Sequence, residues 1–507
     1  MRDQDHPTTT SGARVKDRFL GLADTPLRRR IVVGALACGL VTGGAISVAA
    51  GQVRAVQPIT DTAGTSVLDE AKLEERETLA EAARRARSSG QSVEVLELRS
   101  ERSSVFANPN GSRSTKLYAG PVRVREGGRW RSLDVRLQSQ GGKVRPRAAT
   151  ADVAFSNGGD HSLAHLEGKR GSLALTWEGK RLPAPTLAGS KAVYRDVKPG
   201  VDVAAEAQSQ GVDDRVVVRR VPKRALVLRF GLKLRGLTAR LTAADRLELR
   251  NAHGKRVAVA DPARMFGAEV GRRSQEPVKQ ARVATRLVEE EGGWQVLELR
   301  PNRAFLSSVK GPITIDPGAN LTTNGDTYVS SDWRTARYGA STELKSGSYN
   351  GRNLHRSLVR FPRRAGGGAN GLAGVPKGSR VISAAMHLYN YWSWSCQPRT
   401  TEVYRVSREW SVSSASWAKQ PLVGARYGSA SHAKGYNSSC PAGFVGFPIT
   451  GLAQRWVDES VPNYGVRVQP RDEARRDVYS WRKFRSANYS SGSRAPYLVV
   501  TYAAAGS

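Results

Sequence analysis

The feature that most constrains the fold is a run of alternating residues between positions 386 and 396. Leu388 and its even-numbered neighbours share one parity, whereas Tyr389 and Tyr391 share the other. Period-two alternation that is rich in aromatic residues predicts a β-strand with one buried face. Residues 401–406 follow a polar turn and predict an antiparallel return strand.

Short runs of the same kind recur between residue 92 and about residue 316, separated by Gly, Asn and Pro. They lie at 93–98, 122–124, 133–137, 173–177, 216–218, 226–230, 247–249, 257–260 and 294–299. Regularly spaced short strands with turn signals predict an all-β sandwich or barrel. We therefore expect a mostly β protein with an N-terminal β-region and a jelly-roll-like C-terminal β-sandwich.

The chain of 507 residues is too long for one compact core and predicts several domains. We expect five segments in chain order: a cytoplasmic basic stretch, an export segment, a linker with an exposed helix, a β-rich domain and the β-sandwich. Their predicted bounds are 1–30, 31–50, 51–91, 92–317 and 318–505.

Residues 31–50 carry no charge and follow the cluster Arg28-Arg29-Arg30. A segment of this length can span a bilayer, and the arginines would stay in the cytoplasm. The sequence 47–49 also offers the small-x-small pattern of a signal-peptidase site. Export is therefore predicted, with an extracellular protein that is either secreted or anchored to the cell membrane.

A helix is predicted over residues 67–88, because acidic residues crowd its start and arginines its end. Thr65 or Ser66 could cap it, and Gly90 could end it. Its apolar stripe is thin, so the pattern fits an exposed stalk as well as a helix that packs on the next domain.

The chain has 79 Lys and Arg against 45 Asp and Glu, a net charge of +34. Such a field attracts polyanions, among them anionic polymers of a cell wall. A codon bias towards Arg explains the charge equally well. Nucleic acid is not expected as a partner, because the basic residues are scattered and no nucleic-acid-binding motif accompanies them.

Cysteines and histidines give no metal or catalytic site. Cys396 and Cys440 lie in the predicted exported part, where disulfides persist, and we expect them to be bonded. His161 and His165 have a spacing of four without a third ligand. Hydrolase, phosphate-binding and dinucleotide motifs are all absent from the sequence. We therefore expect a protein that is not an enzyme and needs no metal or cofactor.

Aromatic rings are the remaining candidate for function. Sugars bind to exposed Tyr or Trp rings because the C–H faces of the sugar are apolar. Tyr389 and Tyr391 point away from the Leu388 face and are the predicted ligand-binding residues. Packing in a core or between domains would explain the same two residues. Trp392 and Trp394 are predicted on the buried side.

The C-terminal third carries a spread of motif residues, which are Asp326, Tyr328, Arg356, Phe361, Gly378, Leu388-Tyr389, Trp410, Trp417, Trp456, Asn463-Tyr464-Gly465, Pro496-Tyr497-Leu498 and Tyr502. On these residues it resembles the DNRLRE domain of exported bacterial proteins, a β-sandwich related to a carbohydrate-binding-module type. The resemblance implies binding or scaffolding at the cell envelope, with a wall or extracellular polysaccharide as partner.

The region before it resembles an actinobacterial region that precedes such domains, on the basis of residues 106–111, 121–124 and 194–202. The same region forms the beginning of some large RHS-type wall-associated and toxin-delivery proteins. An accessory or delivery module related to those toxin systems is therefore the alternative function.

Overall fold

The computed structural model describes residues 77–168, 171–243, 245–317, 325–489 and 492–503. Most of these residues lie in antiparallel β-sheets, which confirms the predicted fold class. The predicted export segment 31–50 lies outside the described residues. No helix in the described part of the chain combines the length and the apolar character that crossing a membrane requires.

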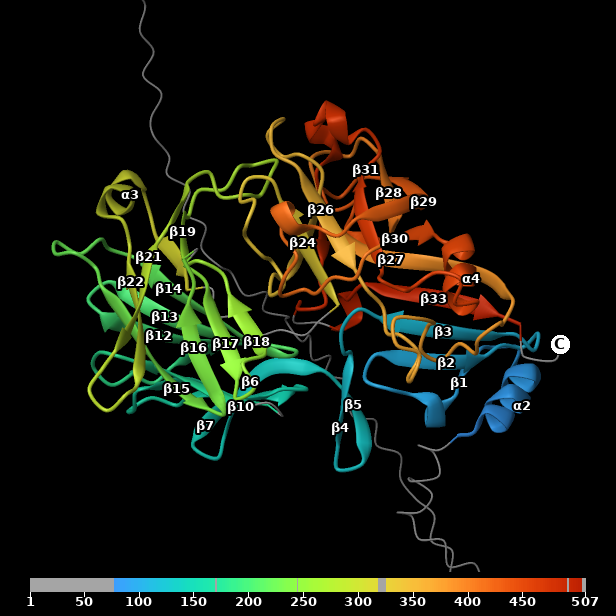
Figure 1. The fold of residues 1–507 in the computed structure, drawn as a ribbon, viewed down its shortest axis with the longest axis horizontal. Helices are drawn as coiled ribbons and strands as arrows, with labels where there is room; N and C mark the ends of the chain where they lie inside the picture. Colours follow the sequence, from blue (N-terminus) through green and yellow to red (C-terminus); the bar gives the residue numbers. More distant parts are fainter. Residues whose placement is uncertain (1–76, 169–170, 244, 318–324, 490–491, 504–507) are drawn as a thin grey trace, which may run out of the picture. The chain divides into compact units, whose positions relative to one another are not determined.

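The C-terminal part is a β-sandwich of two sheets (Figure 1). The first sheet has the order β1-β2-β3-β33-β27-β32-β25, and β30 also pairs with β27. Its strands are β1 (Val93–Glu94), β2 (Ser103–Ala107), β3 (Arg113–Tyr118), β25 (Glu343–Ser346), β27 (Val381–Ser393), β30 (Gly443–Pro448), β32 (Arg482–Arg485) and β33 (Tyr497–Tyr502).

The second sheet has the order β24-β26-β31-β28-β29. Its strands are β24 (Asp326–Ser330), β26 (His355–Val359), β28 (Arg399–Val406), β29 (Val423–His432) and β31 (Val466–Pro470). One core joins the two sheets, because Leu388 and Leu498 of the first and Val403 and Val468 of the second belong to one buried cluster. Helix α4 (Thr450–Val457) adds Trp456 to this core.

The predicted pairing of the strand at 386–396 with the run 401–406 is wrong. β27 pairs with β30, β32 and β33, whereas β28 pairs with β29 and β31 in the opposite sheet. Both runs are strands, but the turn between them carries the chain from one sheet to the other. Local alternation predicts a strand without naming its partner.

The N-terminal part is built of two larger sheets around one buried cluster, with a third sheet of three strands, β16-β17-β18. The two larger sheets have the orders β21-β22-β15-β10-β9-β8-β7-β6 and β11-β12-β13-β14-β23-β19-β20. The strands are β6 (Asp134–Gln140), β7 (Lys143–Ala148), β8 (Asp152–Ser156), β9 (Ser162–Gly168), β10 (Gly171–Trp177), β11 (Thr186–Ala188), β12 (Lys191–Lys198), β13 (Val201–Gln208), β14 (Gly211–Val218), β15 (Leu228–Arg235), β16 (Leu237–Leu241), β17 (Leu247–Asn251), β18 (Arg256–Ala260), β19 (Arg264–Gly267), β20 (Gln280–Arg282), β21 (Ala284–Glu289), β22 (Gln295–Arg300) and β23 (Ile313–Asp316).

Shorter elements complete the described chain. They are the hairpin β4 (Arg123–Glu126) and β5 (Arg129–Ser132), helix α3 (Arg303–Ser308), and the 3₁₀ turns η1 (Leu96–Leu98), η2 (Trp417–Lys419), η3 (Glu473–Arg475), η4 (Val478–Ser480) and η5 (Gly492–Arg494).

The first three strands of the predicted N-terminal domain belong to the C-terminal sandwich. All six residues of β3 pair with β33, and the Leu117 side chain lies fully buried in the sandwich core. Strand pairing therefore crosses the boundary predicted at residue 317. The predicted domains stay predictions as units of folding. The pattern of residues 93–118 predicts a half-buried meander, but it does not indicate that β3 pairs with β33.

The predicted helix before this meander packs against it. Helix α2 (Leu79–Ser89) starts at the N-cap Thr78, which forms a capping box with Glu81, and Gly90 ends it in the left-handed conformation. Ala82 and Ala86 are fully buried against β1 and β2. The described helix is thus not a free stalk, and the predicted caps Thr65 and Ser66 lie outside the described residues.

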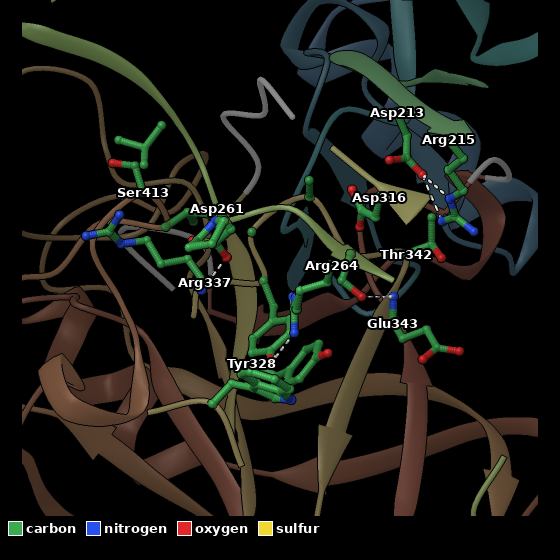
Figure 2. Close-up of a pocket in the computed structure, with 18 of the residues that line it drawn as sticks. Asp213, Arg215, Asp261, Arg264, Asp316, Tyr328, Arg337, Thr342, Glu343 and Ser413 are labelled. Atoms are coloured by element: carbon green, nitrogen blue, oxygen red, sulfur yellow. Dashed lines mark hydrogen bonds and ion pairs between the residues drawn. The ribbon is translucent and has the colours of Figure 1, made fainter. Parts of the chain in front are cut away.

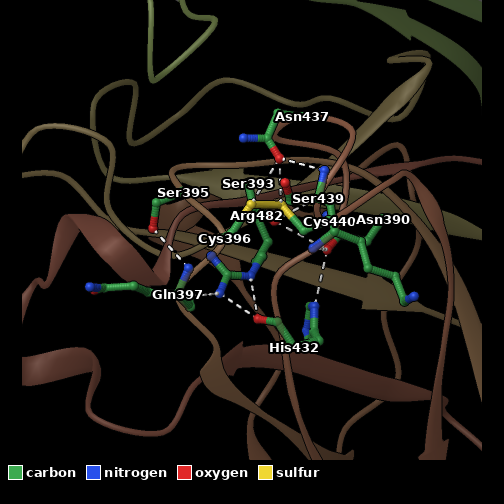
Figure 3. Close-up of a disulfide and its surroundings, with 11 residues drawn as sticks. Asn390, Ser393, Ser395, Cys396, Gln397, His432, Asn437, Ser439, Cys440 and Arg482 are labelled. Carbon is green, nitrogen blue, oxygen red and sulfur yellow. Dashed lines mark hydrogen bonds between the residues drawn. A yellow bond between two sulfur atoms is a disulfide. The ribbon is translucent and has the colours of Figure 1, made fainter.

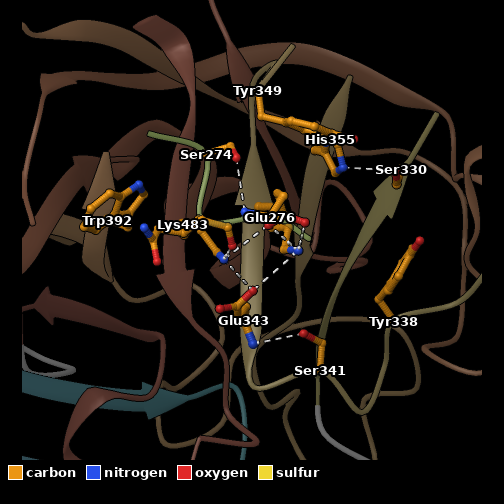
Figure 4. Close-up of polar contacts among 12 residues, drawn as sticks. Ser274, Glu276, Ser330, Tyr338, Ser341, Glu343, Tyr349, His355, Trp392 and Lys483 are labelled. Atoms are coloured by element: carbon orange, nitrogen blue, oxygen red, sulfur yellow. Dashed lines mark hydrogen bonds and ion pairs between the residues drawn. The ribbon is translucent and has the colours of Figure 1, made fainter. Parts of the chain in front are cut away.

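A loop at residues 271–277, which we call the docking loop, ties the N-terminal part to the outer face of the first sandwich sheet (Figure 4). Its consecutive carbonyls accept hydrogen bonds from Trp392 Nε1 (2.8 Å), Trp481 Nε1 (2.8 Å) and Lys483 Nζ (3.0 Å). The carboxylate of Glu276 then lies 2.7 Å from Lys345 Nζ.

This contact is a buried ion cluster with two cations and two carboxylates. Lys483 Nζ lies 3.2 Å from Glu276 and 3.1 Å from Glu343, and both lysine side chains are less than a tenth exposed. Burial would raise the pKa of Glu343, but the two lysines lower it to about 2. Glu343 is therefore ionised at neutral pH. Removing any one member would leave a buried charge without its partner.

Candidate functional site

The outer face of the first sandwich sheet carries a row of aromatic side chains. In β27 the Leu388 side chain points into the core, and Tyr389 is half-buried on the opposite face. In β33 the same alternation buries Leu498 and places Tyr497 outside. The pairing of these strands aligns the outward residues across the sheet, because period-two alternation keeps one face of each strand in register.

Tyrosines and arginines alternate along one end of this row. The guanidinium carbon of Arg485 lies 3.6 Å from the ring centre of Tyr391 and 4.1 Å from that of Tyr489. Arg494 lies 5.8 Å from the Tyr489 ring and 4.8 Å from the Tyr389 ring. These distances are those of cation–π contacts, so each arginine is held by rings on two sides.

The row continues from Tyr389 towards β3. The Tyr389 ring packs edge-on against Phe444 at 5.2 Å, and Phe444 packs against Tyr497 at 5.1 Å. Tyr497 also stacks on His387 at 4.6 Å, and Lys116 Nζ lies 4.1 Å from the Tyr497 ring centre. We call the whole set the aromatic strip. Its members are Lys116, Tyr118, His387, Tyr389, Tyr391, Phe444, Arg485, Tyr489, Arg494 and Tyr497.

The cations of the aromatic strip have no acidic partner among the described residues. Lys116, Arg485 and Arg494 form neither an ion pair nor a side-chain hydrogen bond there, although Arg485 Nε is buried. Lys345 and Lys483 on the same sheet are each paired with two carboxylates. The strip is therefore a row of ring faces and uncompensated positive charge.

Burial sets the protonation of the strip. It lowers the pKa of His387, and the nearby Lys116 lowers it further, so this imidazole is neutral at pH 7. It raises the pKa of Tyr391 well above the usual value, and Glu343 beside the hydroxyl adds to the shift. Tyr391 donates a hydrogen bond to Glu343, which fixes this end of the strip beside the docking loop.

The structure brings the two predicted ligand-binding residues into one strip, with Arg485, Tyr489 and Arg494 between them. It does not place Trp392 as predicted, because a register shift between Asn390 and Trp392 turns the strand. Ser393 is buried instead, and Trp392 reaches the docking loop. The arginines were missed because they follow β27 by about a hundred residues, and only the pairing of β32 with β27 brings the first of them near.

The predicted disulfide between Cys396 and Cys440 is present, with a Cα–Cα distance of 5.7 Å (Figure 3). It joins the segment after β27 to the loop before β30. Beneath it, His432 contacts Asn390 at 3.0 Å and Thr401 at 3.1 Å. The disulfide thus closes a loop over a buried polar network. No group of three His, Cys, Asp or Glu that could hold a metal occurs in the residues that the structure describes.

Replacing both cysteines by serine is expected to lower the free energy of unfolding by about 4 kcal/mol, because the bond closes a loop with a sequence separation of 44. Denaturant titration of the double variant beside the unmodified chain measures the loss. The unmodified chain in excess reductant serves as control and should show the same shift. Equal midpoints for all three samples would show that packing alone holds this end of the sheet.

No curated protein matches the sequence. Among solved structures, an exo-β-1,3-galactanase from Phanerochaete chrysosporium is 9% identical, covering 76% of this chain and 100% of that one, with a TM-score of 0.12. The N-terminal domain of an adhesin from Streptococcus gordonii is 10% identical, covering 81% and 74%, with a TM-score of 0.10. TM-scores this low carry no argument about fold or function. Residues 317–502 match the model of carbohydrate-binding module family 96, so this part of the chain is similar to a carbohydrate-binding β-sandwich.

Proposed function

We propose that the protein is an exported, non-enzymatic binding protein of the cell envelope that holds an acidic polysaccharide on the aromatic strip. The match to a carbohydrate-binding module supports a glycan as ligand. The predicted export segment supports a place outside the cytoplasm, and the net charge of +34 supports an anionic partner.

The observation that carries the proposal is the alternation of rings with cations that lack a carboxylate partner. A sugar ring needs an apolar face to lie on, which Tyr389 and Phe444 offer. A uronate or phosphate on the same sugar needs a cation beside that face, which Arg494 and Lys116 offer. Rings on two sides orient Arg485 and Arg494 before a ligand arrives, so little side-chain freedom is lost on binding.

The proposal predicts that Arg494→Gln weakens binding of polygalacturonate about tenfold, because a hydrogen bond to a charged group contributes on the order of 1.5–3 kcal/mol. Affinity electrophoresis of the full chain in gels with polygalacturonate measures the change. The matched control is Arg303→Gln, which removes an exposed arginine of α3 outside the strip. It lowers the net charge by the same amount and should change the affinity less than twofold.

Two further arms separate the strip from a general charge effect. Tyr389→Leu should weaken binding severalfold, because Arg494 loses one of its two rings. Binding through the overall charge would instead fall equally in both arginine variants and vanish with salt, since exposed charges more than about 10 Å apart are screened at 0.1 M. Equal losses in Arg494→Gln and Arg303→Gln, or equal retention of neutral dextran and polygalacturonate, would contradict the proposal.

A further inference from the structure

A cavity of about 1120 Å³ lies between the N-terminal part and the C-terminal sandwich (Figure 2). The N-terminal part contributes Asp213 and Arg215 from β14 and Arg264 from β19. The sandwich contributes β24 and the segment that follows it. In the close-up, Asp261 and Arg337 lie on the left, opposite Asp213 and Arg215. The volume exceeds the range of about 300–1,000 Å³ that is usual for sites that enclose small organic ligands, so the cavity has room for more than one sugar ring.

Aromatic side chains form part of its wall. Tyr328 and Tyr338 are stacked with ring centres 4.0 Å apart. Arg264 lies 5.0 Å from the Tyr338 ring and donates a hydrogen bond to its hydroxyl at 3.1 Å. The ring of Trp333 lies 5.8 Å from the same guanidinium. Flat aromatic and guanidinium surfaces thus line the cavity.

Several buried polar atoms along this wall have no hydrogen-bond partner in the protein. Two are acceptors, one carboxylate oxygen each of Asp261 and Asp332. The others are donors, the indole nitrogen of Trp333 and two guanidinium nitrogens of Arg337. All four residues line the cavity. Buried polar groups are normally paired. Each of these atoms has less than 1 Å² of accessible surface, so it meets a ligand in the cavity only when its side chain turns towards the ligand.

The wall of the cavity has more carboxylates than Lys and Arg side chains, eight against five. Asp213 pairs with Arg215 at 2.8 Å, and Lys345 pairs with Glu276 at 2.7 Å. Burial raises the pKa of Asp213 and of Asp261 to about 6, which reduces the negative charge in mildly acidic solution. The wall therefore offers no excess of cations to an anionic ligand, unlike the aromatic strip.

We propose that this cavity is a second binding site, which takes a short neutral oligosaccharide or the neutral end of a glycan chain. Hydroxyl groups both donate and accept, so a polyhydroxylated ring can pair with the carboxylates, the indole and the guanidinium together. The faces of such a ring pack on the aromatic wall. The site is independent of the proposed function of the strip, because it lies partly outside residues 317–502 and uses none of the strip's residues.

Saturation-transfer NMR on the full chain tests this site with cellotetraose, maltotetraose, laminaritetraose and mannotetraose as probes. At least one of them is expected to bind, and calorimetry then gives its affinity. Ala268→Trp adds a large ring to the cavity wall, because Ala268 lines the cavity and is exposed, and should lower the affinity at least tenfold. The matched control is Ala425→Trp on the exposed part of β29, which should change it less than twofold.

Trp333→Phe keeps a ring but removes one unpaired donor, and it should lower the affinity about fivefold. If circular dichroism shows that Ala268→Trp does not fold, the affinity of Trp333→Phe tests whether the tetrasaccharide binds in the cavity. Arg494→Gln in the strip should leave tetrasaccharide binding unchanged, so failure of one site is distinguishable from failure of the other. Absence of binding for all four probes, or equal binding by Ala268→Trp and Ala425→Trp, would overturn the proposal.

Discussion

A chain reduced to residues 317–502, the part that matches the binding-module family, is expected not to fold. The reduced chain lacks β3, so the edge of β33 is left without its six paired residues, and the core loses Leu117. It also lacks the docking loop, so Lys345 and Lys483 lose Glu276. The loss of a buried leucine alone costs about 2–5 kcal/mol, a large share of the 5–15 kcal/mol that stabilises a typical domain.

Circular dichroism and denaturant titration of this fragment beside a chain of residues 77–503 make the comparison. The longer chain should unfold cooperatively, whereas the fragment should aggregate through its open edge. A synthetic peptide of residues 77–122, added during refolding, should increase the folded fraction by supplying β1–β3 in trans. A fragment that folds cooperatively by itself would show that β3 and the docking loop are dispensable.

Glu276→Ala is expected to lower the free energy of unfolding by about 3–5 kcal/mol, the usual cost of removing one partner from a buried ion pair. Without this carboxylate, two buried lysines share Glu343 alone. Burial lowers the pKa of Lys345, but Glu276 is the first of the groups that raise it well above its ordinary value. The variant therefore loses the group that contributes most to keeping this lysine charged inside the protein.

Denaturant titration at pH 7 measures the loss, and Glu409→Ala is the matched control. The Glu409 side chain is 64% exposed and lies 3.4 Å from Arg363, so its removal should cost less than about 1 kcal/mol. Limited proteolysis should cut the Glu276→Ala variant within the docking loop earlier than the control. Similar unfolding midpoints for both variants would mean that the hydrogen bonds to the loop carbonyls hold the two parts together without the ion cluster.

What the sequence could predict follows from local patterning. Alternation at Leu388 and Tyr389 is a property of neighbouring residues, so the strand and its two faces could be read directly. Cys396 and Cys440 could be paired because no other cysteine lies in the predicted exported part. The same alternation of neighbouring residues allowed Tyr389 and Tyr391 to be placed on the outer face.

What the sequence could not predict depends on distant partners. The alternation of β3 is the same whether it pairs with β2 alone or also with β33. The register shift after Asn390 moves Trp392 from its predicted face, and no Gly or Pro near this position signals the irregularity in the sequence. The docking loop binds largely through its carbonyl groups, which every residue carries, so its side chains give little sign of the contact.

The pairing of β3 with β33 has a consequence for the order of events during synthesis. The hydroxyl groups of Ser114 and Thr501 lie 2.9 Å apart although 387 positions separate them in the chain. At about 5–20 residues per second, β3 waits roughly 20–80 s for its partner strand to emerge. During that interval its edge is open to other chains, so a high local concentration of nascent chains at the ribosome should lower the yield of folded protein.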